Sequence, residues 1–151
     1  MEEAFKITRV SRQIYSSFFD QYSLEQLNKV PVGFNNNIIW NIGHIVVAQQ
    51  ALVYLASGNQ PMISKELMAL YTRGTKPERN VTQEEADEIK ELLFDTIKKS
   101  HEDYKRGLFI NYPERKTEFG FILSSIEDAI TFNNYHEGVH LGIIMSLRKF
   151  V

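Results

Sequence analysis

The stretch Asn134-Tyr135-His136-Glu137-Gly138-Val139-His140-Leu141-Gly142 decides the fold and the candidate site of this 151-residue chain. His136 and His140 are four residues apart, and helical geometry places residues with this spacing on one face. The chain has four histidines, and a third, His44, stands inside another strongly apolar segment. Three histidines on the apolar faces of two helices predict a metal site inside a helical bundle.

A helical wheel at about 100° per residue places His136 and His140 within the apolar stripe of the last helix. The apolar residues that lie within about 40° of His136 on this wheel are Ala129, Phe132, Ile143 and Leu147. On the wheel of the earlier segment, His44 shares its face with Trp40, Val47, Ala51 and Leu55. We therefore expect all three imidazoles to point into the protein.

Two interpretations of these inward histidines remain open. Imidazoles that are buried without partners cost roughly 1–3 kcal/mol each, and a divalent ion would satisfy all three at once. Three neutral imidazoles with an open fourth position form a recurrent arrangement for catalytic zinc. The alternative is a structural polar core in which hydrogen bonds satisfy the rings. For His101, which has no such companion, we expect a surface or edge position.

Neighbouring side chains are candidates to support such a site. A metal-bound imidazole normally donates its second ring N–H to an acceptor. Asn41 precedes His44 by about one turn, and Asn133 precedes His136 in the same way. Both asparagines could accept this hydrogen bond, and both could equally be ordinary interior amides. The aromatic residues expected in the core or in a pocket wall are Trp40 and Phe132.

The pattern H-E-x-x-H resembles the zinc-protease motif, in which Glu137 would be the general base. That motif needs a third protein ligand, and no acidic residue follows Glu137 to supply it. A protease is therefore not expected. The wheel places Glu137 at about 100° from His136, beside the site, where it could move a proton in catalysis. It could equally be a boundary carboxylate that faces solvent.

Hydrophobic periodicity in the rest of the chain predicts four long amphipathic helices and no convincing strand. The first helix is expected over about residues 4–21, and the second runs from N-caps at residues 35–37 to residue 57. The third is expected from residue 82 to residue 107, and the fourth over residues 124–149. Capping boxes predict helix starts at Ser23–Gln26, Thr82–Glu85 and Ser124–Glu127. Residues 58–81 contain one short amphipathic piece, 64–71, and 107–123 form a loop. This order predicts an all-α four-helix bundle.

Composition limits the class of protein. The 151 residues suit one domain over 1–151, and 43% hydrophobic with 24% charged residues is ordinary for a globular protein. The net charge of −2 and the absence of a basic stripe argue against nucleic acid as a partner. The chain has no cysteine, which excludes disulfides and a thiol nucleophile of its own and fits a reducing compartment.

Two further features favour a cytoplasmic protein. The start, Met1-Glu2-Glu3-Ala4-Phe5-Lys6, lacks the basic and apolar regions of a signal peptide. The most apolar segment, residues 38–56, contains Asn41, His44, Gln49 and Gln50, and we expect it to be too polar for a membrane span. We therefore expect no membrane association.

With these residues in place, the chain resembles the DinB-like family of metal-binding four-helix bundles. One matching segment is Asn36-Asn37-Ile38-Ile39-Trp40-Asn41-Ile42-Gly43-His44-Ile45, which is similar to the asparagine-to-W-x-x-G-H stretch of that family. The other is Tyr135-His136-Glu137-Gly138-Val139-His140-Leu141-Gly142, which is similar to its H-x-x-x-H-x-G segment. The resemblance spans nearly the whole chain, and the turn Gly74-Thr75-Lys76-Pro77 adds to it.

The resemblance implies His44, His136 and His140 as ligands of a divalent ion, zinc or nickel. Some relatives are thiol-S-transferases that use a low-molecular-weight thiol, many have no known activity, and family members often form homodimers. We therefore expect a metal-dependent transferase in which an external thiol attacks a small-molecule substrate beside Trp40 and Phe132. The alternatives are a metal-dependent hydrolase or isomerase that activates water, and a non-catalytic helical scaffold.

The scaffold alternative has its own sequence feature. Gly138 and Gly142 lie behind the histidine face, near Met145, and small residues four apart let another helix approach closely. We expect a helix–helix contact there, which could be the interface of a homodimer. The alternative is an exposed back with two tolerated glycines.

Overall fold

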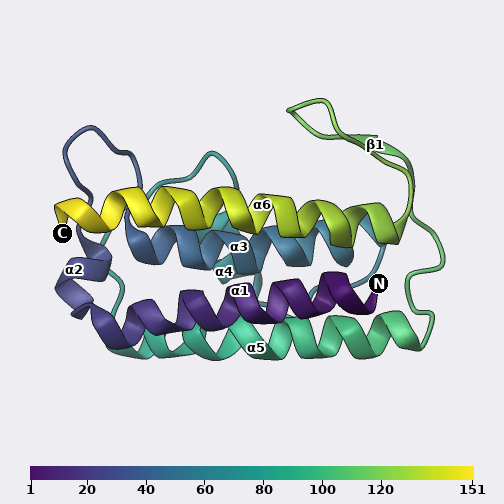
Figure 1. Ribbon diagram of the computed structural model, residues 1–151, viewed down its shortest axis with the longest axis horizontal. Helices are drawn as coiled ribbons and strands as arrows, with labels where there is room; N and C mark the ends of the chain where they lie inside the picture. Colours follow the sequence, from purple (N-terminus) through teal and green to yellow (C-terminus); the bar gives the residue numbers. More distant parts are fainter.

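The computed structural model describes residues 1–151 and confirms the predicted all-α bundle (Figure 1). Its long helices are α1 (Glu2–Gln21), α3 (Ile38–Val53), α5 (Gln83–Lys105) and α6 (Ile126–Leu147). The connecting elements are α2 (Leu24–Asn28), the 3-10 turn η1 (Leu55–Ser57), α4 (Lys65–Tyr71), β1 (Arg115–Lys116), β2 (Ile122–Leu123) and the final 3-10 turn η2 (Arg148–Phe150).

Helix α3 is the central core helix. It contacts α6, α5 and α4, and every residue from Ile38 to Val47 is buried. Figure 1 shows α3 beside α6, with α1 and α5 as the second pair of long helices. Because α6 contacts both α3 and α1, the two segments that carry the histidines lie side by side.

The hydrophobicity of α3 has a structural explanation. The segment Ile38–Ser57 is long and apolar enough to cross a membrane, so our expectation that it was too polar was wrong. However, 78% of its most apolar window is buried inside the bundle. A helix that is apolar on all sides is typical of the centre of a bundle as well as of a membrane span.

The capping boxes at Ser23 and Thr82 and the cap at Asn37 are confirmed. The start of α6 differs by one residue, because Ser125 rather than Ser124 is the N-cap. The Ser125 hydroxyl oxygen accepts from the backbone N–H of Asp128 at 3.1 Å. The Asp128 carboxylate in turn accepts from the backbone N–H of Ser124 at 2.9 Å. In the sequence, Ser124 and Ser125 are each followed by an acidic residue three positions later. The pattern alone therefore does not show which serine is the N-cap.

Residues 107–123, expected to form a loop, contain a short hairpin. Strands β1 and β2 pair antiparallel, with Arg115 opposite Leu123 and Lys116 opposite Ile122. The turn uses Gly120 at φ 89°, a left-handed conformation that favours glycine. Figure 1 shows the hairpin rising beside α6. Strands of two residues are too short to give a detectable period in the sequence.

The segment before α5 is tied to the core through Tyr71 at the end of α4. Its side chain is 5% exposed, and the ring lies directly over Gly43 of α3. A Cβ atom at Gly43 would lie 2.6 Å from Cδ1 of Tyr71. This glycine is therefore required for close packing, and the contact joins the segment before α5 to the core.

Gly138 and Gly142 lie on an exposed face of α6, and apart from adjacent residues and the helix's own backbone no atom lies within 4 Å of a Cβ built at either position. The structure therefore leaves this face open. The contact with a second chain stays a prediction.

We expect Gly43→Ala to destabilise the protein by about 1–3 kcal/mol, because the new methyl group overlaps the Tyr71 ring. Gly142→Ala is the matched control, since it places the same methyl group in open space on another helix, where alanine is favoured over glycine. Urea denaturation of both variants measures the effect. Wild-type stability of Gly43→Ala would contradict the packing described here.

Candidate metal centre

The three histidines singled out in the sequence come together between α3 and α6. One ring nitrogen from each of His44, His136 and His140 lies within 4.8 Å of the others. The ring centroids are 5.2 Å apart for the pair 44–136, 4.7 Å for 44–140 and 4.6 Å for 136–140. The predicted convergence is confirmed, and these residues form a group that can hold a metal ion.

Two of the rings are oriented by hydrogen bonds to carbonyl oxygens. His44 Nδ1 lies 2.7 Å from the backbone oxygen of Tyr71, and His140 Nδ1 lies 2.8 Å from Oδ1 of Asn41. The amide nitrogen of Asn41 donates to the backbone oxygen of Asn37 at 2.7 Å, so its oxygen faces His140. Because carbonyl oxygens only accept, both Nδ1 atoms carry the proton, and both Nε2 lone pairs are free to bind a metal.

The surroundings of His136 differ from the expectation. Asn133, expected to accept from this ring, instead donates to Oε1 of Glu137 at 2.8 Å. The Nδ1 atom of His136 is buried and has no hydrogen-bond partner in the protein. The protein fold therefore leaves one imidazole nitrogen at this site unsatisfied. Three neutral imidazoles that converge on one point are a donor set that fits a divalent ion.

Aromatic rings line the group. Trp40 stacks on His44 with ring centroids 4.9 Å apart and an interplanar angle of 8°, and its indole N–H donates to Thr75 Oγ1 at 3.2 Å. Trp40 is 5% exposed, so it belongs to the core and also forms a wall of the site. Phe132 lies 6.4 Å from His136 between ring centroids. The role of Trp40 and Phe132 in binding a substrate stays a prediction.

Burial sets the charge of the three rings. Desolvation, with a smaller effect of the neighbouring imidazoles, lowers the pKa of His136 to about 4 and that of His140 to about 3. Desolvation also lowers the pKa of His44, against the opposing effect of the Tyr71 carbonyl oxygen. All three rings are therefore neutral near pH 7, which is the form that binds metal ions.

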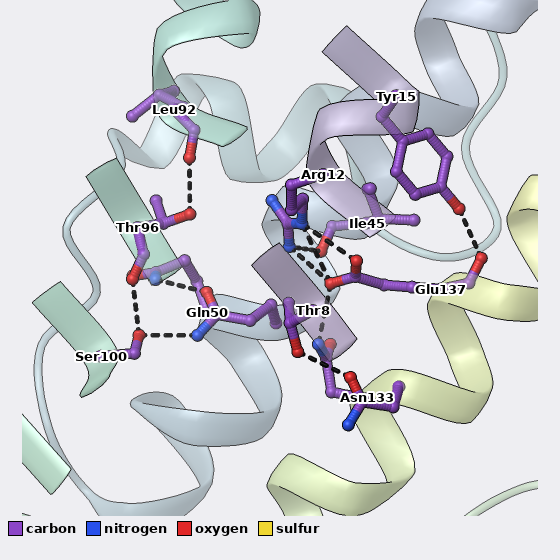
Figure 2. A network of polar contacts seen from close by, with 12 residues as sticks. Thr8, Arg12, Tyr15, Ile45, Gln50, Leu92, Thr96, Ser100, Asn133 and Glu137 are labelled. Carbon is purple, nitrogen blue, oxygen red and sulfur yellow. Dashed lines mark hydrogen bonds and ion pairs between the residues drawn. The ribbon is translucent and has the colours of Figure 1, made fainter. Parts of the chain in front are cut away.

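The alternative in which Glu137 faces solvent was wrong. Its side chain is buried and forms a bidentate ion pair with Arg12 of α1 (Figure 2). Nε and Nη2 of Arg12 donate to Oε1 of Glu137 at 3.0 and 2.7 Å. Arg12 Nη2 also lies 3.3 Å from the backbone oxygen of Ile45 on α3. The carboxylate is thus engaged in the interior and faces α1.

The helical wheel failed for Glu137 because it assumed that the histidines mark the centre of the buried face. The residues of α6 that are most buried centre on the side between α1 and α3: Ile126, Ala129, Ile130, Asn133, Glu137, Ile144 and Leu147. One signal was available in the sequence. Arg12 falls on the apolar face of α1, seven residues after Phe5 and three before Tyr15, where a charge requires a buried partner.

This ion pair fixes α6 at the level of the histidines. Glu137 directly follows His136 and lies three residues before His140, and the Tyr15 hydroxyl donates to its backbone oxygen. Side chain and backbone of the same residue are therefore both held by α1 (Figure 2). The rotation of α6 that presents the two histidines to α3 follows from these contacts.

We expect Arg12→Met to cost about 3–5 kcal/mol of stability, because it leaves the Glu137 carboxylate buried without its partner. The double variant Arg12→Met with Glu137→Met removes both charges and should recover most of this loss. Urea denaturation of the wild type, of both single variants and of the double variant gives the four unfolding free energies of a double-mutant cycle. A single variant Arg12→Met with wild-type stability would show that the pair is not a structural requirement.

Comparison with known proteins agrees with this fold. A family model described as the DinB superfamily matches residues 7–144. A crystal structure of a conserved protein from Enterococcus faecalis is similar with a TM-score of 0.62 and 14% identity, covering 99% of this chain and 95% of that chain. At this identity the similarity concerns the fold alone. No curated protein matches the sequence. Since the family model spans most of the chain, the protein belongs to the DinB superfamily.

Proposed function

We propose that the protein binds one divalent ion, zinc or nickel, through His44, His136 and His140, and that it transfers groups between a small thiol from solution and an electrophilic small molecule. The observation that carries the proposal is the convergence of three neutral imidazoles beside an aromatic wall. Neutral imidazoles are good ligands for divalent ions of this class, and three of them leave a position for a further ligand.

The residues of the chain have separate tasks in this proposal. Asn41 and the Tyr71 carbonyl oxygen keep the protons of His140 and His44 on Nδ1, so that Nε2 of each ring stays available. Trp40 and Phe132 provide apolar surface on which the electrophile packs away from water. A bound zinc or nickel ion supplies Lewis acidity, which lowers the pKa of a thiol or of water toward neutrality.

The position of Glu137 favours a thiol over water as the nucleophile. Activation of water for hydrolysis or isomerisation commonly uses a carboxylate as general base. Glu137 is held by Arg12, and no carboxylate is hydrogen-bonded to His44, His136 or His140. A thiol with lowered pKa can release its proton to solvent without such a base. Because the chain contains no cysteine, the thiol has to come from outside.

The proposed transfer is a nucleophilic substitution at a carbon atom of the substrate. The external thiol loses its proton to solvent, and its sulfur forms a bond to the electrophilic carbon of the substrate. The bond from that carbon to the leaving group breaks, and the leaving group departs with the electron pair. With chlorodinitrobenzene as a test electrophile, the products are an aryl thioether, chloride and a proton.

We expect zinc- or nickel-loaded protein to accelerate thioether formation from chlorodinitrobenzene and mercaptoethanol, because the site lowers the pKa of the thiol. The rate should fall by about a hundredfold or more in His140→Ala, while circular dichroism shows unchanged helicity. His101→Ala, a histidine outside the site, is the matched control and should keep the wild-type rate. Turnover that is indifferent to added thiol would contradict the transferase and favour the hydrolase alternative.

A further inference from the structure

Two elements border the histidines without providing metal ligands. Arg73 lies two residues after Tyr71, the residue whose carbonyl oxygen accepts from His44. On the other side, Phe121 of the hairpin packs on Phe132 with ring centroids 5.2 Å apart. The histidines therefore lie between a cationic loop that follows α4 and an aromatic cluster on α6 and the hairpin.

The hairpin connects these two borders through an ion pair. Glu118, in the turn between β1 and β2, pairs with the guanidinium of Arg73. Both side chains are largely exposed, at 51% for Glu118 and 70% for Arg73. An ion pair this exposed is screened by solvent and contributes little to stability. A carboxylate from solution can therefore compete with Glu118 for the guanidinium.

The charge of the site favours an anionic occupant. The three imidazoles are neutral ligands, so they bring no negative charge to a divalent ion. Glu137, the acidic residue closest in sequence, is neutralised by Arg12. Arg73 adds a further positive charge at the border. The protein supplies Glu118 as the anion on this side, and this residue is itself exposed and exchangeable.

The other cations of the same loop are less suited to bind a ligand here. Arg79 is held by the carboxylate of Glu85, which belongs to the capping box that begins α5. Lys76 has no ion-pair partner, but a single ammonium group lacks the planar fork that matches a carboxylate. Arg73 is thus the arginine of this loop whose pairing depends on the hairpin.

We propose that Arg73 binds a carboxylate of the small molecule that occupies the three-histidine site, and that Glu118 holds the guanidinium when no such ligand is bound. The inference rests on the proposed function for its small thiol, and it adds the chemical class: a thiol that also carries a carboxylate. Guanidinium pairs with carboxylates through two parallel hydrogen bonds, which gives both affinity and orientation. The sulfur then lies toward the histidines and the acid group toward Arg73.

Matched thiols test this assignment. Protein loaded with Co²⁺, whose visible spectrum reports ligand exchange, is titrated with mercaptoacetate, mercaptopropionate and mercaptohexanoate and with the primary amide of each. These acids differ in reach, and each amide has the shape of its acid without the charge. We expect at least one acid to bind about tenfold more tightly than its amide, as for a charge-assisted pair.

Three variants test which residues cause the preference for the acid over its amide. Arg73→Gln should reduce the ratio of acid to amide affinity to about one, whereas Arg79→Gln, the same substitution on the same loop, should preserve it. Glu118→Gln should strengthen acid binding severalfold and leave amide binding unchanged, because it removes the competing carboxylate. A preference that survives in Arg73→Gln, or acid affinity that is unaltered in Glu118→Gln, would overturn the inference.

The same titrations separate this inference from the proposed function. If acids and amides bind the wild-type protein equally, the thiol site stands and the role of Arg73 is overturned. If no thiol in either series changes the Co²⁺ spectrum, the thiol-based function fails, and the inference fails with it.

Discussion

The buried ion pair between Arg12 and Glu137 sets how α6 lies against the rest of the bundle. It joins α1 to α6 and also reaches the backbone of α3 at Ile45. A charged pair in the interior is tolerated only with good geometry and further hydrogen bonds, and here Asn133 supplies one of them. Because Glu137 lies between the two histidines of α6, the same contacts that satisfy its charge direct both imidazoles toward His44.

The site itself depends on hydrogen bonds from elements that carry no ligand. Tyr71, at the end of α4, orients His44 through its backbone oxygen, and its ring can reach this position because residue 43 is glycine. Asn41 orients His140 from the neighbouring helix. These contacts give the rings a defined tautomer before any ion binds, and burial keeps the rings neutral. Such preorganisation lowers the cost of assembling the site.

Helix positions and the caps at Ser23, Asn37 and Thr82 could be predicted from the sequence because they follow from local patterns. The meeting of the three histidines could be expected because each lies on the apolar face of its helix, and a bundle packs such faces together. Asn41 was expected to accept from His44, one turn away on the same helix, but it accepts from His140 of α6. The partner of Glu137 was not predictable, because it is distant in the chain and a wheel of one helix shows only that helix. The contact of Tyr71 with His44 involves backbone, and the pairing of Arg73 with Glu118 depends on a hairpin too short to show a period.

The metal content of purified, tag-free protein tests the central claim most directly. The geometry of His44, His136 and His140 predicts about one divalent ion per chain by elemental analysis, because a single group of three imidazoles is present. His44→Ala should lose this ion and remain folded, whereas His101→Ala should retain it. A chain that binds no divalent ion, or a His44→Ala variant that binds as much as the wild type, would contradict the three-histidine centre.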